Sequence, residues 1–237
     1  MSAIGDRLAQ VRERIAAAAE RAGRAPQDVT LVAVSKTVGI DALREGLAAG
    51  IGDLGENRVR ELKDKLAVLG PMARWHFVGH LQTNKVRHVA GLVELIHSVD
   101  RFGLAEAISR RVAPSGKVQN VLIEVNLAGE SSKSGIDPPR LLPLAREIAQ
   151  LEGIQIRGVM AIPPAPSSPL GSTSGPAPGA PRVYFKELAA LRDLLASEVP
   201  SATELSMGMS GDYETAVEEG ATIVRVGEAI FGPRARP

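Results

Sequence analysis

The sequence predicts an α/β protein that folds as a (β/α)8 TIM barrel, a single domain over residues 1–237 with an extra N-terminal helix. Short runs of β-branched and aliphatic residues alternate eight times with amphipathic segments. The strand runs are continuously apolar, which is typical of a parallel sheet covered by helices. The length of 237 residues also suits one barrel. An open, doubly wound parallel sheet is the alternative that the alternation leaves open.

Residues 1–23 are expected to form the extra helix. Ser2 can cap its start and Gly23 can end it. Apolar residues recur at helical spacing along one face: Ile4, Leu8, Val11 and Ile15.

Eight strands are expected to follow, each bounded by polar or glycine-rich residues. They cover residues 30–35, 51–54, 75–78, 93–98, 118–126, 154–161, 203–206 and 222–226. Helices are expected between them, starting near residues 40, 59, 84, 100, 137, 183 and 210. Asp100 and Ser210 are expected helix caps, and Asp137 with Pro138 is a cap followed by a first-turn proline.

Residues 163–181 interrupt this alternation because they consist almost wholly of Pro, Ser, Gly and Ala. Such a segment cannot bury enough apolar surface to offset the entropy of ordering it. We expect a flexible surface loop there, and we favour a tolerated insertion over a functional lid.

Composition limits the possible functions. The net charge is +1 with basic residues spread along the chain, and aromatic residues make up 3%, so neither nucleic-acid nor membrane-surface binding is expected. No cysteine is present, which excludes disulfides and thiolate chemistry. No signal core or membrane-spanning run is visible, so a soluble, cytoplasmic protein is expected.

Lys36 is the most informative residue. It ends the first apolar run, where a strand meets a loop at the end of the barrel that carries active sites. Partial desolvation of such a lysine would lower the pKa of its amine, and a neutral amine can form a Schiff base with an aldehyde. A solvated lysine that merely ends a strand is the alternative reading.

Glycines and hydroxyl side chains follow strands seven and eight, where barrels often bind phosphate. Ser206 and Ser210 offer hydroxyl groups, and Gly227 lets backbone amides approach an anion. A short helix over residues 228–231 would point its N-terminus at that anion. An amine and an anion site across one barrel mouth suggest pyridoxal phosphate.

Seven segments carry a resemblance to a known family, in the family's order and over nearly the whole chain. They are VAVSKT (32–37), GENR (55–58), WHFVGHLQTNK (75–85), SKSG (132–135), GVMAIP (158–163), LSMGMS (205–210) and VRVGEAIFG (224–232). On these segments the chain resembles the pyridoxal phosphate homeostasis proteins, also described as alanine racemase N-terminal-like or proline synthetase co-transcribed proteins. Val38 and Gly39 depart from the lysine and proline frequent there, and residues 163–181 form a longer insertion than usual.

The resemblance implies roles for individual residues. It implies that Lys36 holds pyridoxal 5'-phosphate as an internal aldimine, that Asn57 flanks its ring and that Arg225 lies near its pyridine nitrogen. Ser206 and Gly227 would help hold the phosphate. The expected cofactor-binding set is Lys36, Asn57, Ser206, Met207, Ser210, Arg225 and Gly227.

Arg225 bears on the expected function. An arginine stays protonated and disfavours protonation of the pyridine nitrogen, which weakens the ring as an electron sink. We therefore expect a pyridoxal phosphate carrier with little or no catalytic activity and no assigned catalytic residue. It would buffer the cofactor or supply it to apo-enzymes. A monomer is expected because the dimerising domain of the racemases is absent.

An amino-acid racemase is the alternative, and it needs a second acid–base group opposite Lys36. The candidate tyrosines are Tyr213 and Tyr184, for which packing roles are expected. Lys133 is equally compatible with contacting phosphate or aldehyde and with an exposed loop position. His76 and His80 lack the spacing of a metal site, so no metal is expected; His80 is expected at the barrel mouth and His97 in the core or mouth.

Overall fold

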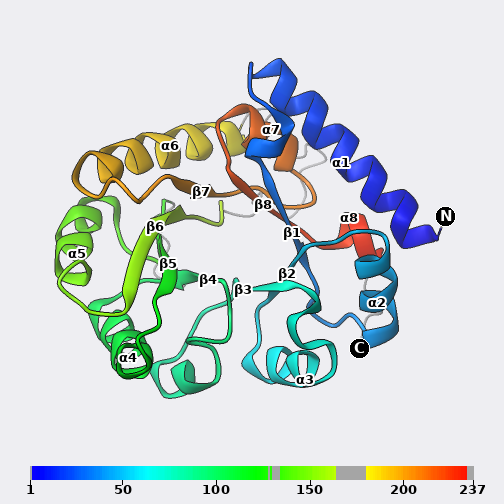
Figure 1. The fold of residues 1–237 in the computed structure, drawn as a ribbon. Helices are drawn as coiled ribbons and strands as arrows, with labels where there is room; N and C mark the ends of the chain where they lie inside the picture. The colour runs from blue at the N-terminus through cyan, green and yellow to red at the C-terminus, as the bar shows by residue number, and fades with distance from the viewer. Residues whose placement is uncertain (1, 128, 130–133, 164–179, 234–237) are drawn as a thin grey trace, which may run out of the picture.

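The computed structural model describes residues 2–127, 129, 134–163 and 180–233. Eight parallel strands close into a barrel in the order of the sequence, with β1 hydrogen-bonded to both β2 and β8 (Figure 1). The strands are β1 Thr30–Val34, β2 Asp53–Glu56, β3 Arg74–Phe77, β4 Leu95–Val99, β5 Gln119–Glu124, β6 Ile154–Met160, β7 Glu204–Ser206 and β8 Ile223–Val226. The closed barrel confirms the expected fold and excludes the open sheet.

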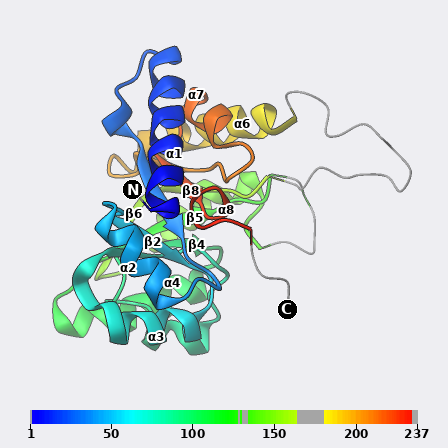
Figure 2. The same cartoon turned by 90° about the vertical axis from the view of Figure 1, so that its right-hand side faces the viewer.

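Helices surround the barrel and cover the outer face of the sheet (Figures 1 and 2). They are α1 Ala3–Arg21, α2 Ile40–Ala48, α3 Val59–Leu69, α4 Phe102–Val112, α5 Leu141–Ile148, α6 Ala180–Glu198, α7 Tyr213–Glu218 and α8 Glu228–Phe231. Neighbouring parallel strands cannot be joined by a tight turn. They need a crossover connection, usually a helix, and these crossovers cover the outside of the barrel.

The extra helix α1 begins and ends as expected. The Gly5 N–H donates to the Ser2 side-chain oxygen at 3.2 Å, and Gly23 takes the positive φ of 67° that lets the chain turn away. The apolar face of α1 packs on α2, α7 and α8. The Arg7 Nε donates to the Ile230 carbonyl at 2.7 Å, so the first helix is tied directly to the last.

Side chains alternate between the two faces of the barrel wall, because a strand repeats every two residues. The outward positions pack with the helices in the large hydrophobic core. The inward positions include a separate small cluster inside the barrel: Val32, Leu95, Leu122, Met160 and Ile223. Two residues further along β1 and β5 from members of this cluster are Val34 and Glu124, which reach the mouth of the barrel.

Three local predictions were wrong. The second strand is Asp53–Glu56 and not residues 51–54, because Asp53 is the residue that aligns with both neighbouring strands. The helix expected from Asn84 is a six-residue 3-10 helix, Thr83–His88, since Gly91 turns the chain with a φ of 79° before β4.

The third error concerns helix caps. Asp100 does not cap α4, whose N-cap is Arg101, and Ser210 does not cap α7, whose N-cap is Asp212. The Ser210 hydroxyl oxygen instead accepts hydrogen bonds from backbone amides at the end of β8.

The expectations for the loop at 163–181 and for Lys133 concern residues that the structure largely does not describe. Nearly all of the expected flexible loop at 163–181, and Lys133, lie outside the described residues. Within the described ranges, no helix has the combination of length and apolar character needed to cross a membrane.

Candidate functional site

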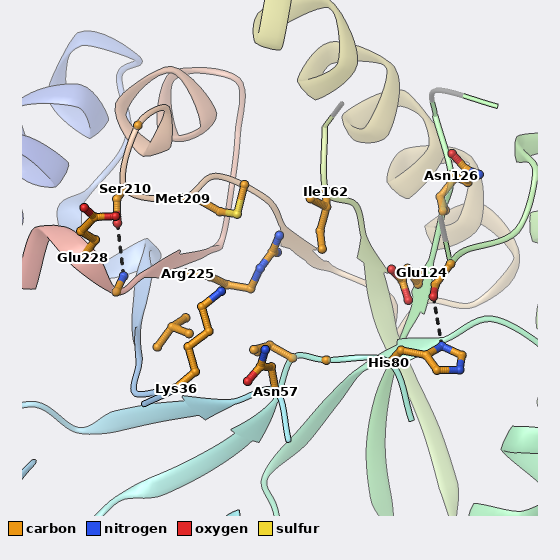
Figure 3. Close-up of a pocket in the computed structure, with 17 residues that line it drawn as sticks. Lys36, Asn57, His80, Glu124, Asn126, Ile162, Met209, Ser210, Arg225 and Glu228 are labelled. Carbon is orange, nitrogen blue, oxygen red and sulfur yellow. Dashed lines mark hydrogen bonds between the residues drawn. The ribbon is translucent and has the colours of Figure 1, made fainter. Parts of the chain in front are cut away.

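The inward positions at the carboxyl ends of the strands surround a cavity of about 560 Å³. Such a volume lies within the range of about 300–1,000 Å³ that is usual for small-molecule sites. Five of the seven predicted cofactor-binding residues line it: Lys36, Asn57, Ser210, Arg225 and Gly227. Figure 3 shows Lys36 pointing into the cavity on the side of Arg225, with Glu124 on the far wall. The structure therefore brings these five residues together at one barrel mouth.

A buried polar network holds the backbone around Lys36. The Lys65 ammonium of α3 donates to the Ser35 carbonyl and to Glu56 Oε1, each at 2.6 Å. The Ser35 hydroxyl donates to the same carboxylate oxygen at 2.6 Å. Because Ser35 precedes Lys36 directly, the network fixes where the half-buried lysine leaves the strand.

The residue after Lys36 is also constrained. Thr37 has a φ of 64°, an uncommon conformation for a residue with a side chain. Its N–H donates to Glu61 Oε2 at 2.7 Å, and its hydroxyl donates to the Lys36 carbonyl at 2.6 Å. The chain is therefore held on both sides of the lysine, which preorganises the position of its amine.

Backbone amides and a hydroxyl group line the cavity at the ends of β7 and β8, and we call this part the anion-binding wall because such groups are suited to an anion. The backbone amides of Gly227 and Ala229 donate to the Ser210 hydroxyl oxygen at 3.3 and 3.4 Å. A Cβ on Gly227 would lie 2.9 Å from the Val34 carbonyl oxygen, so only glycine lets this backbone pack so closely. Glu228 also lines the cavity here, but it is exposed.

Arg225 places a buried positive charge at the centre of the site. Its guanidinium donates to the Ser206 hydroxyl oxygen at 2.6 Å and to the Ala161 carbonyl at 2.9 Å. Burial lowers the pKa of Arg225 to about 10, while Glu124 and Asp212 oppose that shift. The side chain consequently stays cationic at neutral pH.

A chain of polar side chains runs from Arg225 across the barrel interior. Ser206 Oγ is 2.9 Å from His97 Nδ1, and His97 Nε2 is 3.0 Å from His76 Nδ1. His76 Nε2 is 3.1 Å from Asp53 Oδ1. Asp53 in turn accepts two hydrogen bonds from Arg74, at 2.8 and 2.7 Å.

The donors fix a direction along this chain. An arginine only donates, so the Ser206 oxygen accepts from Arg225 and its own proton is available for His97 Nδ1. Burial lowers the pKa of His97 well below its ordinary value, with help from the His76 and Arg225 charges, so His97 is neutral. A neutral His97 whose Nδ1 accepts from Ser206 carries its proton on Nε2 and donates it to His76 Nδ1, so His76 donates from Nε2 to Asp53.

Glu124 is a cavity residue that the sequence reasoning missed. It ends β5 and is 6% exposed, and its Oε2 has no hydrogen-bond partner among the residues described. Burial, and then the negative charge of Asp100, raise the pKa of Glu124 to about 7, while Arg225 opposes the shift. The sequence could have indicated Glu124 as a cavity residue, because it lies near the carboxyl end of the clearest predicted strand, at a position that faces the barrel interior.

Two predicted cofactor residues do not line the cavity. Ser206 and Met207 are both fully buried. The Ser206 side chain supports Arg225 and His97, so its hydroxyl is engaged below the cavity floor. Whether either residue contributes to holding phosphate stays a prediction.

The aromatic and histidine candidates fall in different places. Tyr213 is 2% exposed and does not line the cavity. The guanidinium carbon of Arg14, on α1, lies 5.8 Å from the centre of the Tyr213 ring. Tyr184 lies on α6, also away from the cavity lining. His80 is at the mouth, and His76 and His97 are buried inside the barrel. In the described ranges, no three His, Asp or Glu side chains are grouped so that they could hold a metal ion.

Fold and site together define a class: a (β/α)8 barrel whose cavity presents a lysine amine, an anion-binding wall and a buried guanidinium. Comparisons with known proteins agree. The model of the family "Alanine racemase, N-terminal domain" matches residues 7–235. The pyridoxal phosphate homeostasis protein of Aquifex aeolicus is 45% identical over 231 residues, which cover 97% of each chain.

Solved structures show the same likeness. PipY of Synechococcus elongatus, in a structure with PLP bound, matches with a TM-score of 0.79 and 37% identity, over 97% of this chain and 100% of PipY. A protein of unknown function from Bifidobacterium adolescentis matches with a TM-score of 0.86 and 39% identity, over 96% and 94% of the two chains. The chain therefore belongs to the alanine racemase N-terminal domain family and, within it, to the pyridoxal phosphate homeostasis proteins.

Proposed function

We propose that this protein binds pyridoxal 5'-phosphate at Lys36 and takes part in the homeostasis of that cofactor. The observation that carries the proposal is the meeting of a held lysine amine, amide donors at Gly227 and Ala229, and the buried Arg225 in one cavity. The PLP-bound structure of PipY and the names of the curated relatives support the same function.

The residues of the cavity fit this cofactor. Its aldehyde can condense with the Lys36 amine, and its phosphate is an anion that backbone amides and a hydroxyl group bind well. Ser210, Gly227 and Ala229 supply such donors: the two amides that donate to the Ser210 oxygen can donate to the anion's oxygens instead, and the Ser210 hydroxyl can donate its own proton. Asn57 lines the cavity beside Lys36, and its Oδ1 is a buried acceptor with no hydrogen-bond partner among the described residues.

Arg225 argues for holding over catalysis. A cation beside the pyridine nitrogen disfavours its protonation, and an unprotonated ring withdraws electrons weakly. The contacts of Arg225 with Ser206 and Ala161 fix this cation in place. Ser35 and Thr37 position the amine of Lys36, and the ring would stay bound without being activated.

An absorbance spectrum tests the proposal. Protein incubated with pyridoxal phosphate should show an absorbance band near roughly 420 nm. Borohydride should remove this band and leave the cofactor attached to Lys36 by a reduced bond. Lys36→Ala should lose the band, whereas Lys186→Ala, which changes an exposed lysine of α6, should keep it. A band of equal strength in Lys36→Ala would refute the role of this lysine.

The racemase alternative has lost its tyrosine candidate, because Tyr213 packs under Arg14. Optical rotation of L-alanine incubated with the loaded protein separates the two functions. A carrier leaves the rotation unchanged over hours, and rapid loss of rotation would establish the racemase.

Hand-over of the cofactor to apo-enzymes, a monomeric state and a cytoplasmic location belong to the same proposal. Apo-enzymes must bind the cofactor to become active, and a lysine of such an enzyme can take it from Lys36 by exchange of amines. Mixing loaded protein with an apo-enzyme in the presence of a scavenger of free cofactor would test direct transfer. Activation of the enzyme only without scavenger would contradict it.

A further inference from the structure

The wall of the cavity opposite Lys36 is acidic. In a closed barrel with strands in sequence order, β5 is as far as possible from β1, so Glu124 faces Lys36 across the cavity (Figure 3). Asp100, just after β4, is close enough for its charge to act on Glu124. The function proposed above for Lys36 and Arg225 does not involve this wall.

Glu124 has the properties of a ligand-binding carboxyl. It is 6% exposed, it lines the cavity, and its Oε2 has no hydrogen-bond partner in the described ranges. Buried polar atoms are nearly always paired, and leaving one unpaired is costly. A donor that enters the cavity would therefore find an unused acceptor there.

The charges around Glu124 select the kind of donor. Asp100 has a side chain 12% exposed, with one oxygen bonded to Arg101 and the other 3.7 Å from His80 Nδ1. Arg225, on β8, is the cation that opposes the raised pKa of Glu124, and Lys36 lies on the opposite wall. The carboxyl group of Glu124 in the wall, with the charge of Asp100 acting on it from outside the cavity lining, favours a ligand cation here.

We propose that Glu124 binds the primary ammonium group of an incoming amine and accepts one of its protons. This inference rests on the proposed function, because an amine that takes the cofactor from Lys36 must first lose a proton. In the step, an N–H bond of the ammonium breaks, an O–H bond forms on Glu124, and the nitrogen keeps the electron pair. A carboxyl that titrates near neutrality can take up and release such a proton repeatedly.

The same wall distinguishes two sources of primary amine. A lysine side chain carries an ammonium at the end of an uncharged stem, whereas a free amino acid carries a carboxylate one carbon away. Asp100 and Glu124 repel that carboxylate. The acidic wall therefore favours a lysine side chain of another protein over a free amino acid.

The first experiment uses the protein without cofactor, so it does not depend on the proposed function. Carboxyl ¹³C NMR follows the titration of Glu124 with n-butylamine, a mimic of a lysine side chain, or with L-alanine. We expect n-butylamine to lower the midpoint of Glu124 by about one pH unit, a tenfold change, and L-alanine to lower it much less. An unchanged midpoint with n-butylamine would overturn the inference, and an equal effect of L-alanine would overturn the preference for lysine.

The second experiment uses loaded protein and measures the rate at which n-butylamine removes the cofactor. Glu124→Gln should keep the bound chromophore but release it about tenfold more slowly at neutral pH. Glu187→Gln, an exposed change on α6, is the matched control and should release it at the original rate. Equal rates in Glu124→Gln and the original protein would overturn the inference. Absence of a chromophore in the original protein would instead refute the proposed function.

Discussion

Glu56 and Glu124 stand at the ends of β2 and β5, and both are buried, yet their surroundings differ. Glu56 points outward, where the Lys65 ammonium of α3 and the Ser35 hydroxyl bind its Oε1. Glu124 points inward and lines the cavity. Burial is the largest cause of a raised pKa in both, but the partners of Glu56 pull its pKa back down.

The difference separates a carboxyl that is paired within the chain from one that faces the cavity. Two neighbouring positions on a strand face opposite sides of the barrel wall, so direction decides whether a buried charge meets a helix or a ligand. Glu56 meets a lysine that the chain supplies. Glu124 faces the cavity in which we propose that a ligand binds.

The largest expected effect comes from removing the partner of Glu56. Lys65→Met leaves that carboxyl buried without its cation, and the free energy of unfolding should fall by about 3–5 kcal/mol. Urea denaturation at neutral pH measures the change. Because Glu56 can be protonated in acid, the loss should shrink at lower pH. A loss below about 1 kcal/mol would show that the pair contributes little.

A smaller effect of opposite sign is expected for Glu124→Gln. The folded-state pKa is about 7 and lies above the ordinary 4.5, so the folded protein favours the protonated carboxyl. This contribution to stability is fully present below pH 4.5 and is lost as the pH rises through 7.

Glutamine cannot ionise, so the variant should be more stable than the original protein at high pH. The gain should grow between about pH 5 and pH 8 and reach on the order of 1–3 kcal/mol. Thermal unfolding across this range provides the measurement. A pH-independent difference would show that Glu124 ionises normally in the folded protein.

The smallest effect is expected in the polar chain, which is paired at every link. Ser206→Ala removes the oxygen between Arg225 and His97 and should cost about 1–2 kcal/mol. In the original protein, ¹⁵N NMR should find His97 protonated on Nε2, and the variant should lose that preference. A proton on Nδ1 of His97 in the original protein would reverse the direction of the chain.

The sequence carried enough information for the barrel and for Lys36. Alternating apolar runs give the strands, and the position of Lys36 at the end of one places it at the mouth. The local sequence pattern predicted helices less reliably where few residues separate two strands. The stretch after Gln82 has helical spacing in Val86, Val89 and Ala90, but it forms only a 3-10 helix before Gly91 turns.

The remaining features depend on contacts between distant residues. His76 and Asp53 are 23 positions apart, and His97 and Ser206 are 109 apart, so no local pattern joins them. Glu124 follows three apolar residues at the end of β5, and nothing in the sequence tells that its Oε2 lacks a partner among the described residues. Likewise, the role of Ser206 as support for Arg225 appears only when β7 and β8 lie side by side.

The attachment of α1 to the end of the chain has a consequence for biosynthesis. Residues 3–21 leave the ribosome early, but α7, α8 and the Ile230 carbonyl that Arg7 binds are translated much later. Until then, α2 is the helix that can cover part of the apolar face of α1. The packing surface of α1 is therefore completed, and the Gly227 amide meets the Ser210 hydroxyl oxygen, only after residues 213–231 have been synthesised.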